Sequence, residues 1–349
     1  MNVCFASYQS IMMLKGGPGT QIVQTKKGLE QLGVNVTYLE AWQDFDRTKF
    51  DLIHLFGAHI GTYHLAREIH KLGVPLAVTP IFYSLHSPRF LHTALRFDRL
   101  VKKFVSGIWM DYGLLADICT WADVILPNTK VEGKLIADGF NIQSDKIFVV
   151  PNGVEERFYH ADGTLFRSKY GLGKFILNVG HTGPGRKNVL RLIRAVNKIG
   201  IPAVILGRIE NNSYGRICLE EAKRGRVLIV EALPNDSDLL ASAYAACDTF
   251  VLPSLFETPG IAALEAALAG AKIVITQNGG TQEYFGSYAG YVDPLSVSSI
   301  STGIEKALAA QKNNLLREQI KKEFLWEHVA KKTLTVYEDV LSKRTVNNK

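Results

Sequence analysis

The chain alternates short apolar, β-branched runs with longer stretches in which apolar residues recur at helical spacing. Strands that alternate with helices are typical of βαβ units and a mostly parallel sheet. The runs fall into two sets, at 2–7, 34–39, 51–56, 75–81, 123–127 and 147–150, and again at 175–180, 203–207, 226–232, 248–253 and 271–276. Because the pattern starts over at Phe175, the sequence predicts an α/β protein with two doubly wound sheets in tandem.

The sequence Pro-Asn-Gly-Val at 151–154 follows the last run of the first set and has strong turn chemistry. We therefore place the domain boundary there, with a linker over about 151–172 and a final helix over about 314–342. The predicted domains are 1–155, 156–330, and a helix end with its tail at 331–349 that could return to the first domain.

Composition narrows the class of protein and of partner. A length of 349 residues suits two domains, and 40 Lys and Arg against 33 Asp and Glu give a net charge of +7, which favours anionic partners. Nucleic acid is set aside, because the charge comes without a base-stacking or base-reading motif. No apolar run reaches the ~18 residues of a membrane span and no signal-peptide pattern opens the chain, so a cytoplasmic protein is expected.

The four cysteines, Cys4, Cys119, Cys218 and Cys247, are scattered and form no C-x-x-C pair. That spacing argues against a disulfide framework or a structural zinc site and predicts reduced core residues. Ligands of open α/β sheets bind beyond the carboxyl ends of the strands. We therefore expect the site in a cleft between the two domains, formed by loops that follow strands.

The stretch 252–286 contains strand, loop, helix, strand and glycine loop, with Glu257 and Glu265 eight positions apart. If the whole segment between them were helical, the two carboxylates would lie roughly 12 Å apart on the same side of the helix. That separation suits contacts with the two ends of an extended ligand. Glu265 lies at the edge of an apolar stripe and needs hydrogen-bond donors. Either a protein group supplies them, as a salt bridge or cap, or ligand hydroxyls do.

Three glycine-containing loops follow successive predicted strands. Pro259-Gly260 suits the first turn of a helix, whose free N–H groups attract phosphate, and Gly279-Gly280 follows the next strand. The loop 180–188, GHTGPGRKN, combines three glycines with Arg186 and Lys187, which could neutralise a diphosphate. Together these loops predict a pocket for a nucleoside diphosphate with a further group attached.

These segments resemble the E-x7-E region of retaining glycosyltransferases of the GT-B fold, glycosyltransferase family 4. The likeness rests on YAACDTFVLPS, FETPGIAALEAALAG and GAKIVITQNGGTQE, with KGGPGTQIVQTKKGLEQLGVNVTYLE, ADVILPN and VVPNGVE in the first half. It implies two Rossmann-like domains facing a cleft, the first binding the acceptor and the second a nucleotide sugar. It also implies sugar transfer with retention, without metal or other cofactor, from a UDP- or GDP-sugar to a glycan, lipid-linked or small-molecule hydroxyl.

The resemblance assigns roles to individual residues. Glu265 would bind the ribose hydroxyls, Glu257 would lie beside the donor sugar, and Arg186 with Lys187 would hold the diphosphate. The catalytic set is thus Glu257, Arg186 and Lys187. The remaining donor-binding positions are Gly17, Gly19, Gly180, Thr258, Pro259, Gly260, Ile261 and Ala262.

Two positions depart from the family pattern. Where many members carry a His-Asp or His-Gly pair after the fourth strand, this chain has Ile81 and Phe82, and His86 or His92 could substitute for that histidine. His181 stands where arginine is common. A catalytically silent subunit that binds or stabilises a partner is therefore an alternative, as is a sugar-nucleotide epimerase or phosphorylase of the same fold.

The segment 87–109 interleaves arginines and lysines with phenylalanines, leucines and Trp109. It could be a basic amphipathic helix that rests on an anionic membrane at its inner face or that lines an acceptor cleft. It could equally be an ordinary surface helix with its apolar side on the core.

Overall fold

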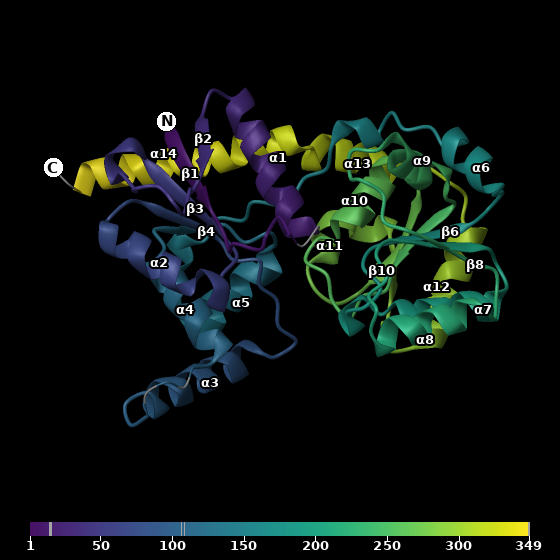
Figure 1. The fold of residues 1–349 in the computed structure, drawn as a ribbon, viewed down its shortest axis with the longest axis horizontal. Coiled ribbons are helices and arrows are strands. Elements are labelled where there is room, and N and C mark those ends of the chain that lie inside the picture. The colour runs from purple at the N-terminus through teal and green to yellow at the C-terminus, as the bar shows by residue number, and fades with distance from the viewer. Residues whose placement is uncertain (14–15, 106, 108, 348–349) are drawn as a thin grey trace. The chain divides into compact units, whose positions relative to one another are not determined.

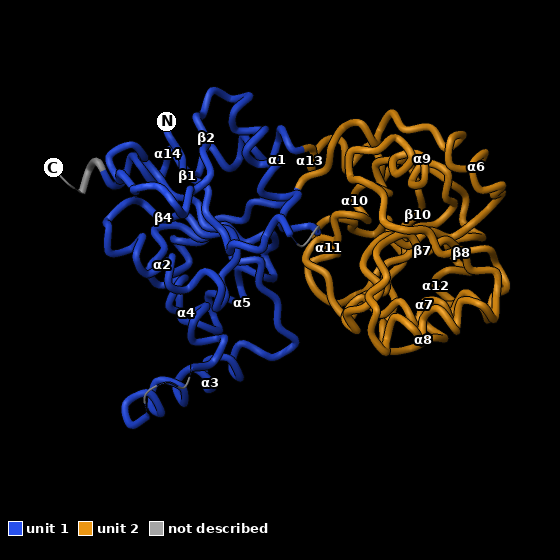
Figure 2. Tube along the Cα trace, viewed as in Figure 1, with its two compact units in different colours: residues 1–152, 326–349 blue, residues 153–325 orange. Residues whose placement is uncertain are grey.

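The computed structural model describes residues 1–13, 16–105, 107 and 109–347. The chain divides into two compact units, one of residues 1–152 with 326–349 and one of residues 153–325 (Figure 2). Each unit is a parallel sheet with helices on both faces, so the predicted α/β class with two Rossmann-like sheets is confirmed (Figure 1).

Unit 1 contains a five-stranded sheet in the order β2-β1-β3-β4-β5. Its strands are β1 (Asn2–Ala6), β2 (Asn35–Tyr38), β3 (Leu52–Phe56), β4 (Leu76–Thr79) and β5 (Val124–Ile125). Its helices are α1 (Gly17–Gln31), α2 (Ile60–Leu72), α3 (Pro88–Val101), α4 (Asp111–Trp121), α5 (Lys130–Phe140) and α14 (Trp326–Asn347). β3 and β4 are buried at every position, as strands covered on both faces must be.

The two faces of the unit 1 sheet have separate cores. Side chains of α2, α4 and α5 cover one face, and those of α1 and α14 cover the other. α14 approaches α1 so closely that a Cβ added at Gly28 would lie 2.7 Å from the Cβ of Ala330. Inside this core Tyr337 of α14 is hydrogen-bonded to His54, whose pKa burial lowers to about 3, so the imidazole stays neutral. The end of the chain is thus an integral part of unit 1.

Unit 2 contains a six-stranded sheet in the order β11-β10-β9-β6-β7-β8. The strands are β6 (Ile176–Val179), β7 (Ala203–Leu206), β8 (Val227–Val230), β9 (Thr249–Leu252), β10 (Lys272–Thr276) and β11 (Gly290–Val292). The helices are α6 (Thr164–Tyr170), α7 (Val189–Ile199), α8 (Ser213–Ala222), α9 (Asp238–Ala246), α10 (Ile261–Leu268), α11 (Thr281–Phe285), α12 (Val297–Ala309) and α13 (Leu315–Phe324). α6, α9, α10 and α13 cover one face, and α7, α8 and α12 the other.

Three local predictions were wrong. Residues 147–150 form only an isolated bridge from Ile147 to Ile125, because Pro127 has no N–H to extend the ladder of β5. The expected linker over 151–172 is packed structure, since Phe158 and Phe166 are buried in the core of unit 2. The expected helix over 314–342 is two helices, separated at Leu325, whose backbone is extended. The strand β11 was not predicted, because three residues beginning with glycine carry little strand signal.

The four cysteines are free and buried, as predicted. No helix in the part of the chain that the structure describes is both long and apolar enough to cross a membrane.

Candidate active site

The candidate site of unit 2 lies at the point where the strand order of its sheet reverses. From β6 the chain continues through β7 and β8 on one side, and then through β9, β10 and β11 on the other. β6 and β9 are parallel neighbours, with Ile176 opposite Thr249, so the loops that follow them leave the same edge of the sheet. Such a reversal is where open α/β sheets bind their ligands.

The loop between β9 and α10 carries Glu257 outside any helix. Helix α10 begins at Ile261, after Gly260 in the left-handed conformation at φ 76°. Two expectations are thereby corrected: Pro259 and Gly260 precede the helix, and the helical estimate of the separation between Glu257 and Glu265 does not apply. Thr258 is half-buried and Pro259 buried beside the start of α10, whose first N–H groups have no acceptor within the helix.

The glycine loop after β10 fixes the backbone of Glu257. The N–H of Glu257 donates to the carbonyl of Asn278 at 3.1 Å, and the N–H of Gly280 donates to the carbonyl of Glu257 at 3.0 Å. A Cβ at Gly279, whose φ is +103°, would lie 1.9 Å from that same carbonyl oxygen. The position therefore needs glycine both for its conformation and for the close approach of the two loops.

The carboxylate of Glu257 meets the predicted basic pair. Lys187 Nζ lies 2.7 Å from Glu257 Oε1 and Arg186 Nη1 lies 3.7 Å from it, while the Glu257 side chain is only 8% exposed. Burial acts to raise the pKa of this carboxyl, but the charges of Lys187 and Arg186 outweigh burial and hold the pKa below its ordinary value. The structure thus brings Glu257, Arg186 and Lys187 together as an ionised cluster.

Asn188 connects the loop 180–188, which carries Arg186 and Lys187, to the rest of the site. Its Nδ2 donates to the carbonyls of Pro253 at 2.8 Å and Pro294 at 2.6 Å, and its own backbone is left-handed, with φ 57°. Arg186 adds a hydrogen bond to the carbonyl of Phe256 and lies over the ring of that residue. The loop 180–188, which begins at the half-buried Gly180, is therefore bonded directly to the loop that follows β9.

Glu265 has very different surroundings. It is half-buried on α10, and its Oε2 accepts a hydrogen bond of 2.6 Å from the hydroxyl of Tyr244. Burial raises the pKa of Glu265 to about 7, although the Tyr244 hydroxyl and the charge of Arg157 act in the opposite direction. Within the described residues, Oε1 receives no hydrogen bond, so it remains available to an added hydroxyl.

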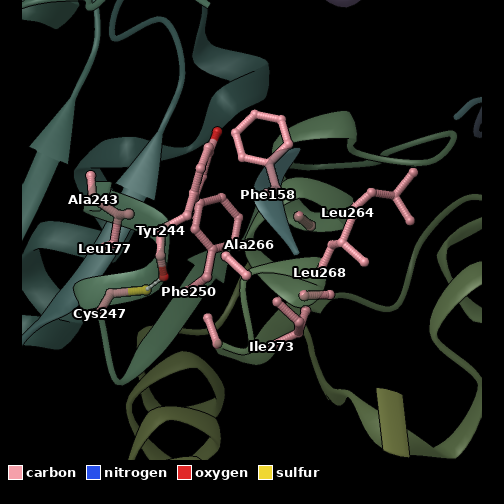
Figure 3. Close-up of a cluster of buried hydrophobic side chains, with 14 of the residues drawn as sticks. Phe158, Leu177, Ala243, Tyr244, Cys247, Phe250, Leu264, Ala266, Leu268 and Ile273 are labelled. Carbon is pink, nitrogen blue, oxygen red and sulfur yellow. Dashed lines mark hydrogen bonds between the residues drawn. The ribbon is translucent and has the colours of Figure 1, made fainter. Parts of the chain in front are cut away.

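Tyr244 is a site residue that the sequence analysis missed. It comes from α9 and is 1% exposed, with its ring packed against those of Phe158 and Phe250 (Figure 3). Nothing in the sequence marks it, because a tyrosine in an apolar helix looks like an ordinary core residue. Asn188 was missed for a similar reason, since its two carbonyl partners lie more than 60 positions away.

In unit 1, Gly17 and Gly19 lie in the first turn of α1 rather than in a loop before it. Helix α1 follows β1, and the strand order of unit 1 reverses between β1 and β3, so these glycines lie at the corresponding reversal point. The quoted segment starts at Lys15, which lies outside the described residues.

The loop after β4 has unusual backbone geometry at the position where the resemblance places histidine. Ile81 is left-handed, with φ 54°, which is strained for a β-branched residue. The buried carboxylate of Glu132 holds the next residue in place, accepting hydrogen bonds of 2.7 Å from the N–H groups of Phe82 and Asn128. His86 stacks on Phe90, and His92 is half-buried on α3.

Over the described ranges no cluster of three or more histidine, cysteine, aspartate or glutamate side chains has the arrangement of a metal site.

The fold resembles that of solved glycosyltransferases over nearly its full length. A sucrose-phosphate synthase from Thermosynechococcus elongatus gives a TM-score of 0.76 at 16% identity, covering 98% of this chain and 100% of that one. HepE of Anabaena, solved in complex with UDP and glucose, gives 0.71 at 16% identity, covering 97% and 100%. The two parallel-sheet units therefore have the GT-B fold.

Comparison of sequences identifies the family. The family models described as Glycosyl transferases group 1 and Glycosyltransferase Family 4 match residues 166–324 and 36–158. An uncharacterized glycosyltransferase of Methanocaldococcus jannaschii is 28% identical over 218 residues, which are 57% of this chain and 55% of that protein. The chain belongs to the family 4, group 1 glycosyltransferases. Its matches span about half the length of the first curated relatives.

Proposed function

We propose that this protein transfers a sugar from a nucleoside-diphosphate sugar to an acceptor hydroxyl, with retention of configuration and without a metal ion. The observation that carries the proposal is the convergence of Arg186, Lys187 and Glu257 at the strand-order reversal of unit 2. A cationic pair beside a helix N-terminus suits a diphosphate. In this reading unit 2 binds the donor and unit 1 the acceptor.

The proposed reaction breaks the bond between the anomeric carbon and the diphosphate and forms a bond from that carbon to the acceptor oxygen. The acceptor proton passes to an oxygen of the departing diphosphate. Arg186 and Lys187, with the N–H groups at the start of α10, would stabilise the charge that develops on the leaving group. Lys187 has three donors, so the hydrogen bond to Glu257 leaves two for phosphate oxygens.

The donor would be held at both ends. We assign the ribose hydroxyls to Glu265, because Tyr244 occupies only its Oε2 and a carboxylate accepts hydrogen bonds from hydroxyls. We assign the sugar to Glu257 and to the backbone of 258–262, with Gly180 lining the approach to the diphosphate. The UDP and glucose in the HepE complex support a UDP-sugar as donor, and a GDP-sugar is the other candidate.

The acceptor would be a glycan, a lipid-linked sugar or a small molecule. Four buried, unpaired thiols fit a reducing compartment and support a cytoplasmic location.

Nucleotide binding tests the donor site without knowledge of the acceptor. Thermal midpoints are measured with UDP, GDP and ADP, and with UDP-, GDP-, ADP- and CMP-sugars, in buffer containing a chelator. A ligand that binds only the folded protein raises the midpoint. Glu265→Gln should weaken the effective nucleotide about 10–100-fold, because it removes charge-assisted hydrogen bonds. Glu305→Gln, an exposed glutamate of α12, is the matched control. Absence of any stabilising nucleotide, or equal affinity in both variants, would overturn the assignment.

A catalytically silent subunit is the second candidate, favoured by the strained Ile81 in place of the family histidine. Release of nucleoside diphosphate from the bound donor separates the two functions. Turnover with any acceptor, or slow hydrolysis without one, supports the transferase. Nucleotide binding without turnover, together with co-purification of a partner enzyme, supports the silent subunit.

A further inference from the structure

Helix α3 of unit 1 carries different side chains on three of its sides. Its inner side consists of Leu91, Leu95 and Asp98, which are buried where α3 packs on α4 and α5. The one carboxylate on this side is compensated, because Asp98 pairs with Lys102 at 2.7 Å. The inner side thus accounts for the attachment of α3 to unit 1 and leaves the other two sides exposed.

The second side is an exposed aromatic stripe, formed by Phe90, Phe97, Leu100 and Phe104. Phe90, Phe97 and Phe104 are spaced by seven residues, which keeps them within roughly 40° of one another on a helix. Phe104 lies in the turn that continues α3. The four side chains are 50%, 63%, 53% and 81% exposed. Such a row of large apolar groups in water is unusual, whereas single exposed apolar residues are not.

The third side is a basic stripe, formed by Arg89, Arg96, Arg99 and Lys103. These four positions fall within roughly 80° on the helix, next to the aromatic stripe. All four residues are exposed, and none of them forms an ion pair with another described residue. Asp98 is the only acidic residue between positions 85 and 109, and it is buried. The exposed charged residues of α3 are therefore all cationic.

We propose that the aromatic and basic stripes of α3 bind the surface of an anionic lipid bilayer. An interfacial helix combines cationic side chains, which attract anionic headgroups, with phenylalanine, leucine and tryptophan side chains that enter the headgroup region. Trp109, 57% exposed beyond the end of α3, adds a residue type enriched at membrane interfaces. Helix α3 lies at the edge of unit 1 (Figure 1), where two adjacent exposed stripes can meet a plane of headgroups.

Charge complementarity selects the lipid over other occupants. A neutral apolar partner would leave four cations of the basic stripe without counter-charges. An acidic protein would satisfy the cations but would not require a continuous row of phenylalanines beside them. An anionic bilayer satisfies both stripes together. The proposal does not depend on the donor site, and the test below uses no nucleotide.

The test is co-sedimentation of the full chain with vesicles, of phosphatidylcholine alone and of phosphatidylcholine with one-third phosphatidylglycerol. We expect binding to the anionic vesicles at low salt, weaker binding at high salt, and little binding to the neutral vesicles. The double variant Arg96→Glu, Phe97→Ser should reduce the partition coefficient at least about tenfold, since it reverses one charge and removes one aromatic anchor. Both side chains are exposed, so the fold should be retained.

The matched control is Arg216→Glu, Ile217→Ser on α8 of unit 2. This pair is also an exposed arginine followed by an exposed apolar residue, and the change in net charge is identical. We expect its partition coefficient to stay within about twofold of the wild-type value. Failure of the wild-type protein to bind anionic vesicles at low salt would overturn the proposal. Equal loss in the two double variants would also overturn it, because the net charge alone would then explain binding.

Tryptophan fluorescence gives a second readout of the same contact. Trp109 should move to a less polar environment on anionic vesicles and shift the emission to the blue. Trp109→Phe should abolish the shift, whereas Trp42→Phe should retain it, although Trp42 is 96% exposed. A shift that disappears with Trp42 instead would place the membrane contact elsewhere on the protein and contradict the proposal.

Discussion

Glu257 and Glu265 lie eight positions apart in one strand–loop–helix segment of unit 2, yet their pKa values are shifted in opposite directions. Both carboxylates are largely removed from water, which by itself raises a carboxyl pKa. Lys187 and Arg186 face Glu257 and hold its pKa below the ordinary value, whereas Glu265 faces the neutral hydroxyl of Tyr244 and its pKa rises to about 7. The charge of the nearest partner, rather than the depth of burial, decides the state of each carboxyl.

The difference separates two kinds of site residue. Glu257 is ionised at neutral pH and its charge is already balanced within the protein. Glu265 changes its protonation near neutral pH and has one oxygen with no protein donor among the described residues. A ligand therefore gains more by adding hydrogen bonds at Glu265 than at Glu257.

The largest effect should come from breaking the ion pair at Glu257. Lys187→Met removes the nearer of the two cations that face the buried carboxylate, and removing one partner of a buried pair costs about 3–5 kcal/mol. We expect a clear fall in the thermal midpoint. Adding Glu257→Met should recover part of it, because the uncompensated charge is then gone.

Lys198→Met is the control, since Lys198 lies near the end of α7 and pairs with no carboxylate of the described residues. Equal midpoints for the Lys187 and Lys198 variants would show that the pair contributes nothing to stability.

The next effect concerns the pH dependence of stability at Glu265. Its folded pKa of about 7 lies above the ordinary value of 4.5, so between these values the folded protein holds a proton that the unfolded chain has released. The free energy of unfolding should therefore fall as the pH rises from about 5 to 8. Glu265→Gln should remove this slope and be more stable than the wild type at pH 8 by about 1–3 kcal/mol.

Thermal midpoints measured from pH 5 to pH 8 check this expectation. Glu305→Gln should keep the wild-type slope, because the Glu305 side chain is exposed on α12. A wild-type slope in the Glu265 variant would show that another group titrates.

A smaller effect is expected from the single hydrogen bond that Tyr244 donates. Tyr244→Phe keeps the ring packed against Phe158 and Phe250 but removes the donor, so the pKa of Glu265 should rise further. The fall in stability should extend to higher pH, with a further loss of about 1–2 kcal/mol at pH 8. The variant Tyr170→Phe, on α6, should leave the pH profile unchanged. If Tyr244→Phe also leaves it unchanged, the hydroxyl does not support the carboxylate.

The strands and the charged site residues could be predicted from the sequence, but the different protonation of the two glutamates could not. Ten of the eleven strands found in the described residues follow predicted apolar runs, because buried parallel strands are continuously apolar. Glu257, Glu265, Arg186 and Lys187 were selected from local motifs. The different states of the two glutamates depend on Tyr244 from α9 and on the loop after β6. Contacts between segments so far apart in the chain leave no local sequence pattern. The left-handed conformation of Gly260, after which α10 begins, could not be predicted from the sequence either.

The smallest change in stability should come from replacing Arg186, the second cation beside Glu257. Its effect is compared with that of replacing Lys187. Arg186 is 41% exposed and lies 3.7 Å from the carboxylate, so its attraction is screened by water and contributes at most about 1 kcal/mol. The thermal midpoint of Arg186→Met should therefore lie close to that of the wild type and far above that of Lys187→Met. If Arg186 binds the diphosphate, however, the same variant should lose nucleotide affinity about tenfold, since a charge-assisted hydrogen bond is lost. The two measurements together distinguish a cation that balances Glu257 from one that is held ready for a ligand. A fall in stability as large as that of Lys187→Met would mean that both cations serve the buried carboxylate alone.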